Sequence, residues 1–148
     1  TTAVNLTAAL QAMGKKVLLC DFDPQANATS GLGLEKRKIK HSVYDVTIND
    51  VPAEKAIVQT KFGDVLPSSA DLAGAGVELI GTEGREQQLG KALQTVKDQY
   101  DLILIDFING IQVRNLFGFI LVSIFSFSNI ILLQIPFLLY LWLKDTTT

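Results

Sequence analysis

Residues 15–31 read KKVLLCDFDPQANATSG. The apolar run at 17–20 leads into two acids, Asp21 and Asp23, and a polar loop follows them. An unbroken apolar run of this length is typical of a strand buried on both faces of a parallel sheet. Open α/β sheets bind their ligands at the carboxyl ends of such strands. The stretch therefore predicts an α/β fold with a functional site where this strand ends.

Helix and strand patterns alternate along the first hundred residues. Expected helices lie at 1–13, 43–46, 52–60 and 85–99, and the last of these is amphipathic. Expected strands lie at 16–21, 63–66 and 102–105. Residues 71–81 fit either a helix interrupted by glycine or a strand. The alternation predicts an incomplete doubly wound parallel sheet.

The composition argues against some classes of function and of covalent structure. The 13 basic residues nearly balance the 15 acidic ones, which disfavours a nucleic-acid-binding surface on composition alone. The basic cluster at 36–40 is interpreted as a solvated loop rather than a phosphate-contacting patch. With one cysteine, Cys20, the chain cannot form an internal disulfide, and the apolar run around Cys20 indicates a core residue.

Four blocks of sequence, in the right order and spacing, resemble the ParA/Soj/MinD family of P-loop partitioning ATPases. The blocks are TTAVNL at 1–6, GKKVLL at 14–19, DFDPQ at 21–25 and NATSGLG at 27–33. A looser similarity continues to YDLILID at 100–106. The resemblance implies a ParA-like nucleotide-binding domain over residues 1–107 and a role in chromosome or plasmid partitioning.

The same resemblance implies which residues form the site, with ATP and Mg²⁺ as cofactors. Asp23 is expected to direct the attacking water, and Asp21 and Asp106 are expected near the magnesium ion. Thr1 and Thr2 are expected to contact the nucleotide. For Asp21 and Asp106 a second reading stays open, because an acid at the end of a buried strand often caps a neighbouring turn.

Family members carry a Lys-Gly-Gly-x-Gly-Lys-Thr phosphate loop immediately before the Thr-Thr pair. The 148 residues contain no such run, so the resemblance implies an N-terminal fragment of an ATPase that is inactive as written. Full-length relatives are cytoplasmic and nucleoid-associated. Their partners are a second copy of the chain, DNA bound without sequence preference, and a ParB-like activator.

The composition changes abruptly after the family resemblance ends. Residues 108–148 form an apolar tail, and 115–143 contain no Asp, Glu, Lys or Arg. Three interpretations stay open: a frameshifted or chimeric tail, buried strands of a soluble domain, or one membrane-spanning helix. The last would make the chain a single-span membrane protein with a degenerate nucleotide-fold module in the cytosol.

Overall fold

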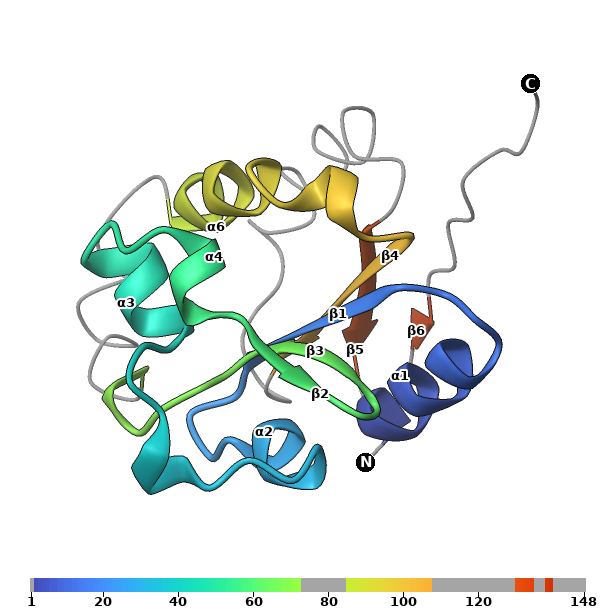
Figure 1. Cartoon of the computed structure of the whole chain (residues 1–148). Coiled ribbons are helices and arrows are strands. Elements are labelled where there is room, and N and C mark those ends of the chain that lie inside the picture. Colours follow the sequence, from blue (N-terminus) through green and yellow to red (C-terminus); the bar gives the residue numbers. More distant parts are fainter. Residues whose placement is uncertain (1, 73–84, 108–129, 135–137, 140–148) are drawn as a thin grey trace.

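A six-stranded sheet forms the centre of the computed structural model, which describes residues 2–72, 85–107, 130–134 and 138–139 (Figure 1). The strands are β1 (Val17–Phe22), β2 (Val58–Thr60), β3 (Gly63–Leu66), β4 (Leu102–Phe107), β5 (Ile130–Gln134) and β6 (Leu138–Leu139). Their order across the sheet is β2-β3-β1-β4-β5-β6. The pairs β3–β1, β1–β4 and β4–β5 are parallel, whereas β2 and β6 add at the edges in antiparallel orientation. The expected parallel sheet is confirmed in its central strands.

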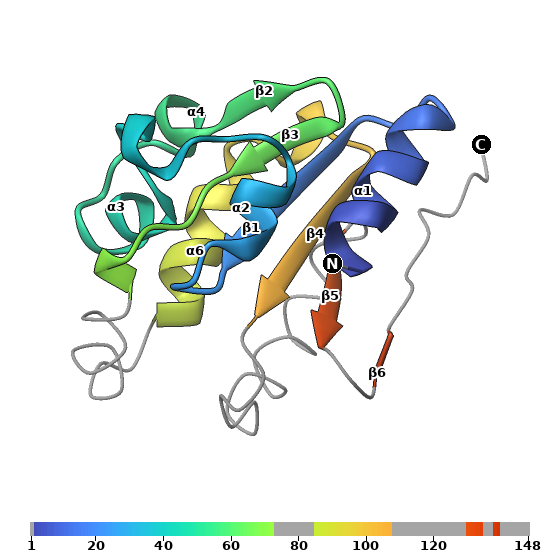
Figure 2. The same ribbon diagram turned by 90° about the horizontal axis from the view of Figure 1, so that it is seen from below.

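Helices cover both faces of this sheet (Figures 1 and 2). The helices and single helical turns are α1 (Thr2–Ala12), α2 (Asn27–Gly31), η1 (Lys36–Lys38), α3 (Val43–Ile48), α4 (Ala53–Ala56), α6 (Arg85–Gln94) and η2 (Lys97–Gln99). Side chains of α1 and α2 pack on one face, and those of α3, α4 and α6 pack on the other. Covering helices on both faces are what the unbroken apolar strands predict.

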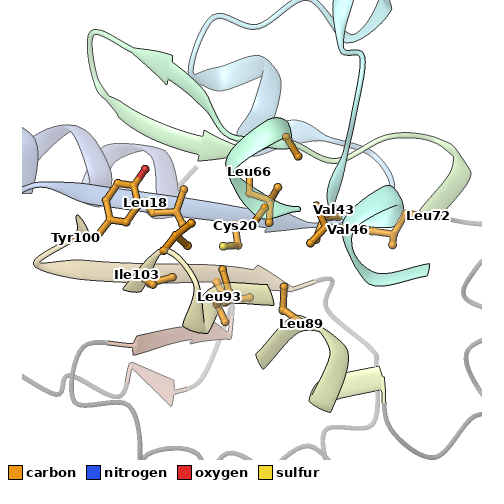
Figure 3. Close-up of a cluster of buried hydrophobic side chains, with 14 residues drawn as sticks. Leu18, Cys20, Val43, Val46, Leu66, Leu72, Leu89, Leu93, Tyr100 and Ile103 are labelled. Atoms are coloured by element: carbon orange, nitrogen blue, oxygen red, sulfur yellow. The ribbon is translucent and has the colours of Figure 1, made fainter. Parts of the chain in front are cut away.

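Alternating side chains of β1 supply both halves of the core, because successive residues of a strand point to opposite faces. Leu18 and Cys20 lie in the cluster under α3 and α6, which Figure 3 shows together with Ile103. Val17 and Leu19 lie in the cluster under α1 and α2. All four residues of this run are at most 1% exposed, so β1 is buried on both faces along this run. Cys20 is a core residue, as expected, and burial raises the pKa of its thiol.

Two expected elements differ from the structure. Residues 52–60 were expected as one helix, but α4 ends at Ala56 and Val58–Thr60 forms β2. The backbone of β2 pairs with β3, and this ladder outweighs the helical spacing of the sequence. Residues 85–99 were expected as one helix, but α6 ends at Gln94 and a 3₁₀ turn follows. The ambiguous segment 71–81 lies outside the described residues from 73 onward.

The described parts of the apolar tail are strands. Residues 130–134 form β5, which pairs with β4 in parallel and in register from Ile103 to Asp106. At these residues the structure therefore has sheet rather than the single helix over 115–143 that one interpretation requires. Among the described residues, no helix has the length and apolar character needed to cross a membrane.

Candidate functional site

Two of the predicted acids come from directly paired positions of the central strands. Asp21 of β1 lies opposite Asp106 of β4 in the parallel ladder. The pairs before them on the same face, including Leu19 with Leu104, are buried under α1 and α2. Because residues two apart in a strand point the same way, both carboxyl groups lie on the α1 and α2 side at the carboxyl edge of the sheet. This is the edge where open α/β sheets bind ligands.

Asp21 is fully buried and takes part in three hydrogen bonds. Its Oδ1 accepts the Asp23 amide at 3.1 Å, and its Oδ2 accepts the amide of Thr29 at 2.7 Å and the hydroxyl of Thr29 at 2.6 Å. Burial raises the pKa of Asp21, and the hydrogen bonds oppose that shift. Since Thr29 lies in the first turn of α2, Asp21 does cap a neighbouring helix, which is the alternative that the sequence left open.

Asp23 lies in the loop between β1 and α2 and is partly exposed. Its Oδ1 accepts the amide of Gln25 at 2.8 Å, and its Oδ2 accepts the side-chain amide of Asn27 at 3.3 Å. Both contacts are local to the loop, so they fix the orientation of the carboxylate without burying it. A partly exposed, oriented carboxylate can accept a proton from, or align, a water molecule at this edge.

Asp106 is 8% exposed and lies one residue before the end of β4. Burial is the main cause that raises its pKa to about 6, and the charges of Asp21 and Asp23 add to the shift. Carboxylates that repel one another at one edge favour binding of a cation there. Asp106 therefore fits the chemistry of a magnesium site. Asp21 fits direct coordination less well, because both of its oxygens already accept protein hydrogens.

The loop before α2 has a strained backbone at one position. Ala26 adopts a left-handed conformation, with φ 52° and ψ 43°. For a residue with a Cβ atom this conformation costs about 1–2 kcal/mol. It turns the chain from the Asp23 loop into α2, and thereby directs the amide of Thr29 toward Asp21. The side chain of Lys36 also reaches back to the carbonyl oxygen of Gln25 in this loop.

The predicted nucleotide contacts are described only in part. Thr1 lies outside the described residues, and Thr2 is the exposed first residue of α1. The first turn of α1 lies near the end of α2, since a Cβ atom on Gly31 would come within 2.9 Å of the Val4 side chain. Across residues 2–72 and 85–107, no three His, Cys, Asp or Glu side chains form a metal-binding group by themselves.

Sequence reasoning missed two residues of this site, Thr29 and Ser68. Thr29 is 0% exposed, although it stands in a polar stretch without hydrophobic periodicity. The Ser68 amide donates to the Thr29 hydroxyl oxygen at 3.0 Å across 39 residues of sequence. No spacing rule links residues so far apart, so the sequence holds no signal for this contact.

The fold defines a doubly wound α/β domain with acids at the carboxyl edge of its sheet, and a family model agrees with this class. A model described as an AAA domain matches residues 1–134. The match includes β5, well past the end of the resemblance that the sequence motifs carry. The chain belongs to this AAA domain family and, as its relatives show, to the ParA/Soj-type P-loop ATPases within it.

Two bacterial relatives illustrate the similarity. The chain is 49% identical over 108 residues to the sporulation initiation inhibitor protein Soj of Bacillus subtilis, covering 72% of this chain and 43% of that protein. It is 41% identical over 108 residues to the chromosome partitioning protein ParA of Myxococcus xanthus, covering 72% of this chain and 38% of that protein. The chain thus spans about two fifths of the length of these relatives.

Solved structures share the fold and contain nucleotide. Cobyrinic acid a,c-diamide synthase of Mycobacterium smegmatis, with bound ADP and magnesium, superposes with a TM-score of 0.63 at 38% identity, covering 72% of this chain and 46% of that one. The septum site-determining protein MinD of Pyrococcus horikoshii, complexed with Mg-ADP, superposes with a TM-score of 0.61 at 30% identity, covering 89% of this chain and 50% of that one. Nucleotide and Mg²⁺ are therefore ligands of this family.

Proposed function

We propose that this chain carries the part of a ParA/Soj-like ATPase that directs water and Mg²⁺, in a protein that partitions chromosomes or plasmids. The observation that supports this most is the placement of three acids at one edge of the sheet. Asp21 and Asp106 are paired across β1 and β4, and Asp23 follows two residues after Asp21. A relative named as a chromosome partitioning protein supports the biological role.

Two of the three acids have distinct chemical tasks in this proposal. Asp23, which is oriented by Gln25 and Asn27 and partly exposed, aligns the attacking water. Asp106 would hold Mg²⁺ at the end of β4, where the nearby charges of Asp21 and Asp23 favour a cation. By the family resemblance, Thr1 and Thr2 are assigned to contact the nucleotide phosphates, and Thr2 is the first residue of α1. Bound Mg²⁺ would neutralise the charge of the phosphate groups.

The remaining partners follow from the family. ATP-driven pairing with a second copy, DNA binding without sequence preference and stimulation by a ParB-like activator belong to the proposal for the whole protein. So does a cytoplasmic, nucleoid-associated location. We assign these roles to no particular residue, and the chain spans less than half of the relatives from which they come.

A segment exchange tests the proposal. Residues 2–106 replace the matching segment of Bacillus subtilis Soj, and Mg²⁺-dependent ATP hydrolysis is measured. We expect hydrolysis by the exchanged protein, loss of at least about 100-fold on Asp23→Ala with ATP binding retained, and no change on Asp98→Asn at an exposed position of η2. Full activity of the Asp23→Ala protein would refute the role given to Asp23.

The 148-residue polypeptide itself provides a second test. Phosphate-loop amides and their lysine supply the main attraction for phosphate in P-loop proteins, and the 148 residues hold no such run. We expect no heat of binding when ATP and Mg²⁺ are titrated into it in a calorimeter. Micromolar affinity would show that the site does not depend on such a loop.

A further inference from the structure

The Thr29 side chain contacts both Asp21 and the segment after β3. Its hydroxyl oxygen lies 2.6 Å from Asp21 Oδ2 and 3.0 Å from the amide nitrogen of Ser68. Thr29, Asp21 and Ser68 are each 0% exposed. The three groups therefore form a buried chain of hydrogen bonds, and Asp21 at one end of it also accepts the amide of Asp23.

The direction of these bonds is fixed by chemistry. The Ser68 amide can only donate, so the Thr29 oxygen accepts there. The Thr29 hydroxyl proton is then free for Asp21 Oδ2, which lies at the shorter distance. Asp21 also receives the amides of Thr29 and Asp23. All three of these donors direct a proton at the buried carboxylate, and such charge-assisted bonds offset the free energy lost when a charge is buried.

The position of Asp23 depends on this arrangement. The Asp23 amide donates to Asp21 Oδ1, so Asp21 fixes the backbone at the residue proposed to align water. Among the described residues, the hydrogen bonds that the Asp23 carboxylate accepts come from Gln25 and Asn27, both close to it in sequence. Any shift of Asp21 would therefore be passed directly to the Asp23 backbone.

Ser68, at the other end of these hydrogen bonds, belongs to the segment after β3, and this segment is itself anchored to α3. Pro67 accepts the amide of Val43 at 2.7 Å, and the hydroxyl groups of Ser69 and Ser42 lie 3.1 Å apart. Both contacts join this segment to the start of α3. The Ser68 hydroxyl is buried without a hydrogen-bond partner among the described residues, so its backbone amide, not its side chain, provides the link to the site.

We propose that Thr29 is the positioning residue of this site: its hydroxyl group holds Asp21, and with it the loop of Asp23, against the end of β3. The functional meaning rests on the proposed function, in which Asp23 aligns water. The physical link between Thr29, Asp23 and Ser68 can be tested separately in the 148-residue chain, without any nucleotide.

Amide hydrogen exchange measured by NMR tests the link. Thr29→Val keeps the shape of the side chain but removes the hydroxyl group. We expect the Asp23 and Ser68 amides to exchange at least about tenfold faster than in the wild type, relative to the Leu19 amide in β1, because a bond to a charged group is lost. Thr29→Ser, which keeps the hydroxyl group and lacks the methyl group, should stay within about threefold of the wild type.

The matched control is Thr47→Val, because the Thr47 hydroxyl is also buried and donates to the Val43 carbonyl within α3. It should leave both amides within about twofold. If Thr29→Val does not fold, Thr29→Ala replaces it.

Unchanged exchange at Asp23 and Ser68 in the valine or alanine variant would overturn the proposal, and so would equal acceleration by Thr47→Val. Because no ATP is present, failure here leaves the ATPase proposal standing, and failure of the segment exchange leaves this link standing.

Discussion

Asp21 and Asp106 lie opposite each other on the two central parallel strands, yet the surroundings of their carboxyl groups differ. Asp21 accepts three hydrogen bonds from its own loop and α2. Asp106 has its pKa raised to about 6 by burial, with the charges of Asp21 and Asp23 adding to the shift. One acid of the pair thus holds the loop through hydrogen bonds, while the other has a pKa much closer to neutral.

The raised pKa of Asp106 predicts how stability depends on pH. Its usual value is 3.8, so between that pH and about 6 the folded protein binds more protons than the unfolded chain. The contribution of Asp106 to the free energy of unfolding is therefore fully present below pH 3.8 and is lost as pH rises through 6. Urea unfolding at several pH values should show this fall in the wild type and a flatter profile in Asp106→Asn. A profile that Asp106→Asn does not change would contradict the assignment.

The charge of Asp23 is predicted to raise the pKa of Asp106 while contributing little to the free energy of unfolding. Asp23→Asn removes a nearby negative charge, so the pKa of Asp106 should fall. The asparagine oxygen can still accept the Gln25 amide, and the loss of unfolding free energy should stay below about 1 kcal/mol. Carboxyl ¹³C chemical shifts followed through a pH titration measure the first effect, and urea unfolding measures the second. An unchanged or higher Asp106 pKa in the variant is the contrary outcome.

Asp21→Asn is predicted to be far more damaging than its small change in shape suggests. An asparagine side chain has one acceptor oxygen in place of two. Its NH₂ group would take the place of the other carboxylate oxygen and would face an N–H or O–H donor that binds that oxygen in the wild type. We expect a loss of about 2–4 kcal/mol in the free energy of unfolding. Asp98→Asn, at an exposed position, serves as the control and should change it by less than about 0.5 kcal/mol. Equal effects of the two changes would show that the Asp21 contacts contribute little.

The contact between α1 and α2 is predicted to tolerate no added methyl group. A Cβ atom on Gly31 would lie 2.9 Å from Val4 Cγ2, so Gly31→Ala should cost about 1–3 kcal/mol. Val4→Ala removes the atoms in the way, and the double variant should therefore lose less than the sum of the two single changes. Unfolding of all four proteins of this double-mutant cycle measures the coupling. Simple additivity would show that the added methyl group does not contact the Val4 side chain.

Much of the fold follows from local pattern. The apolar runs before Asp21 and Asp106 predict two buried strands of a parallel sheet, and the structure pairs them directly in parallel. Helix α1 lies within the helix that the sequence predicts over residues 1–13. The strand at Val58–Thr60 was missed because its ladder partner, β3, contributes the stabilisation that the local sequence does not encode.

The sequence by itself determined the central parallel strands, the two acids that end them and the family to which the chain belongs. These features follow from the identity and spacing of residues that are consecutive in the sequence. Only the tertiary structure decided that Thr29 joins Asp21 to Ser68, that the pKa of Asp106 rises, and that residues 130–134 extend the sheet beside β4. Each of these depends on groups brought together from distant segments, where burial and electrostatic interaction act through space and not along the sequence.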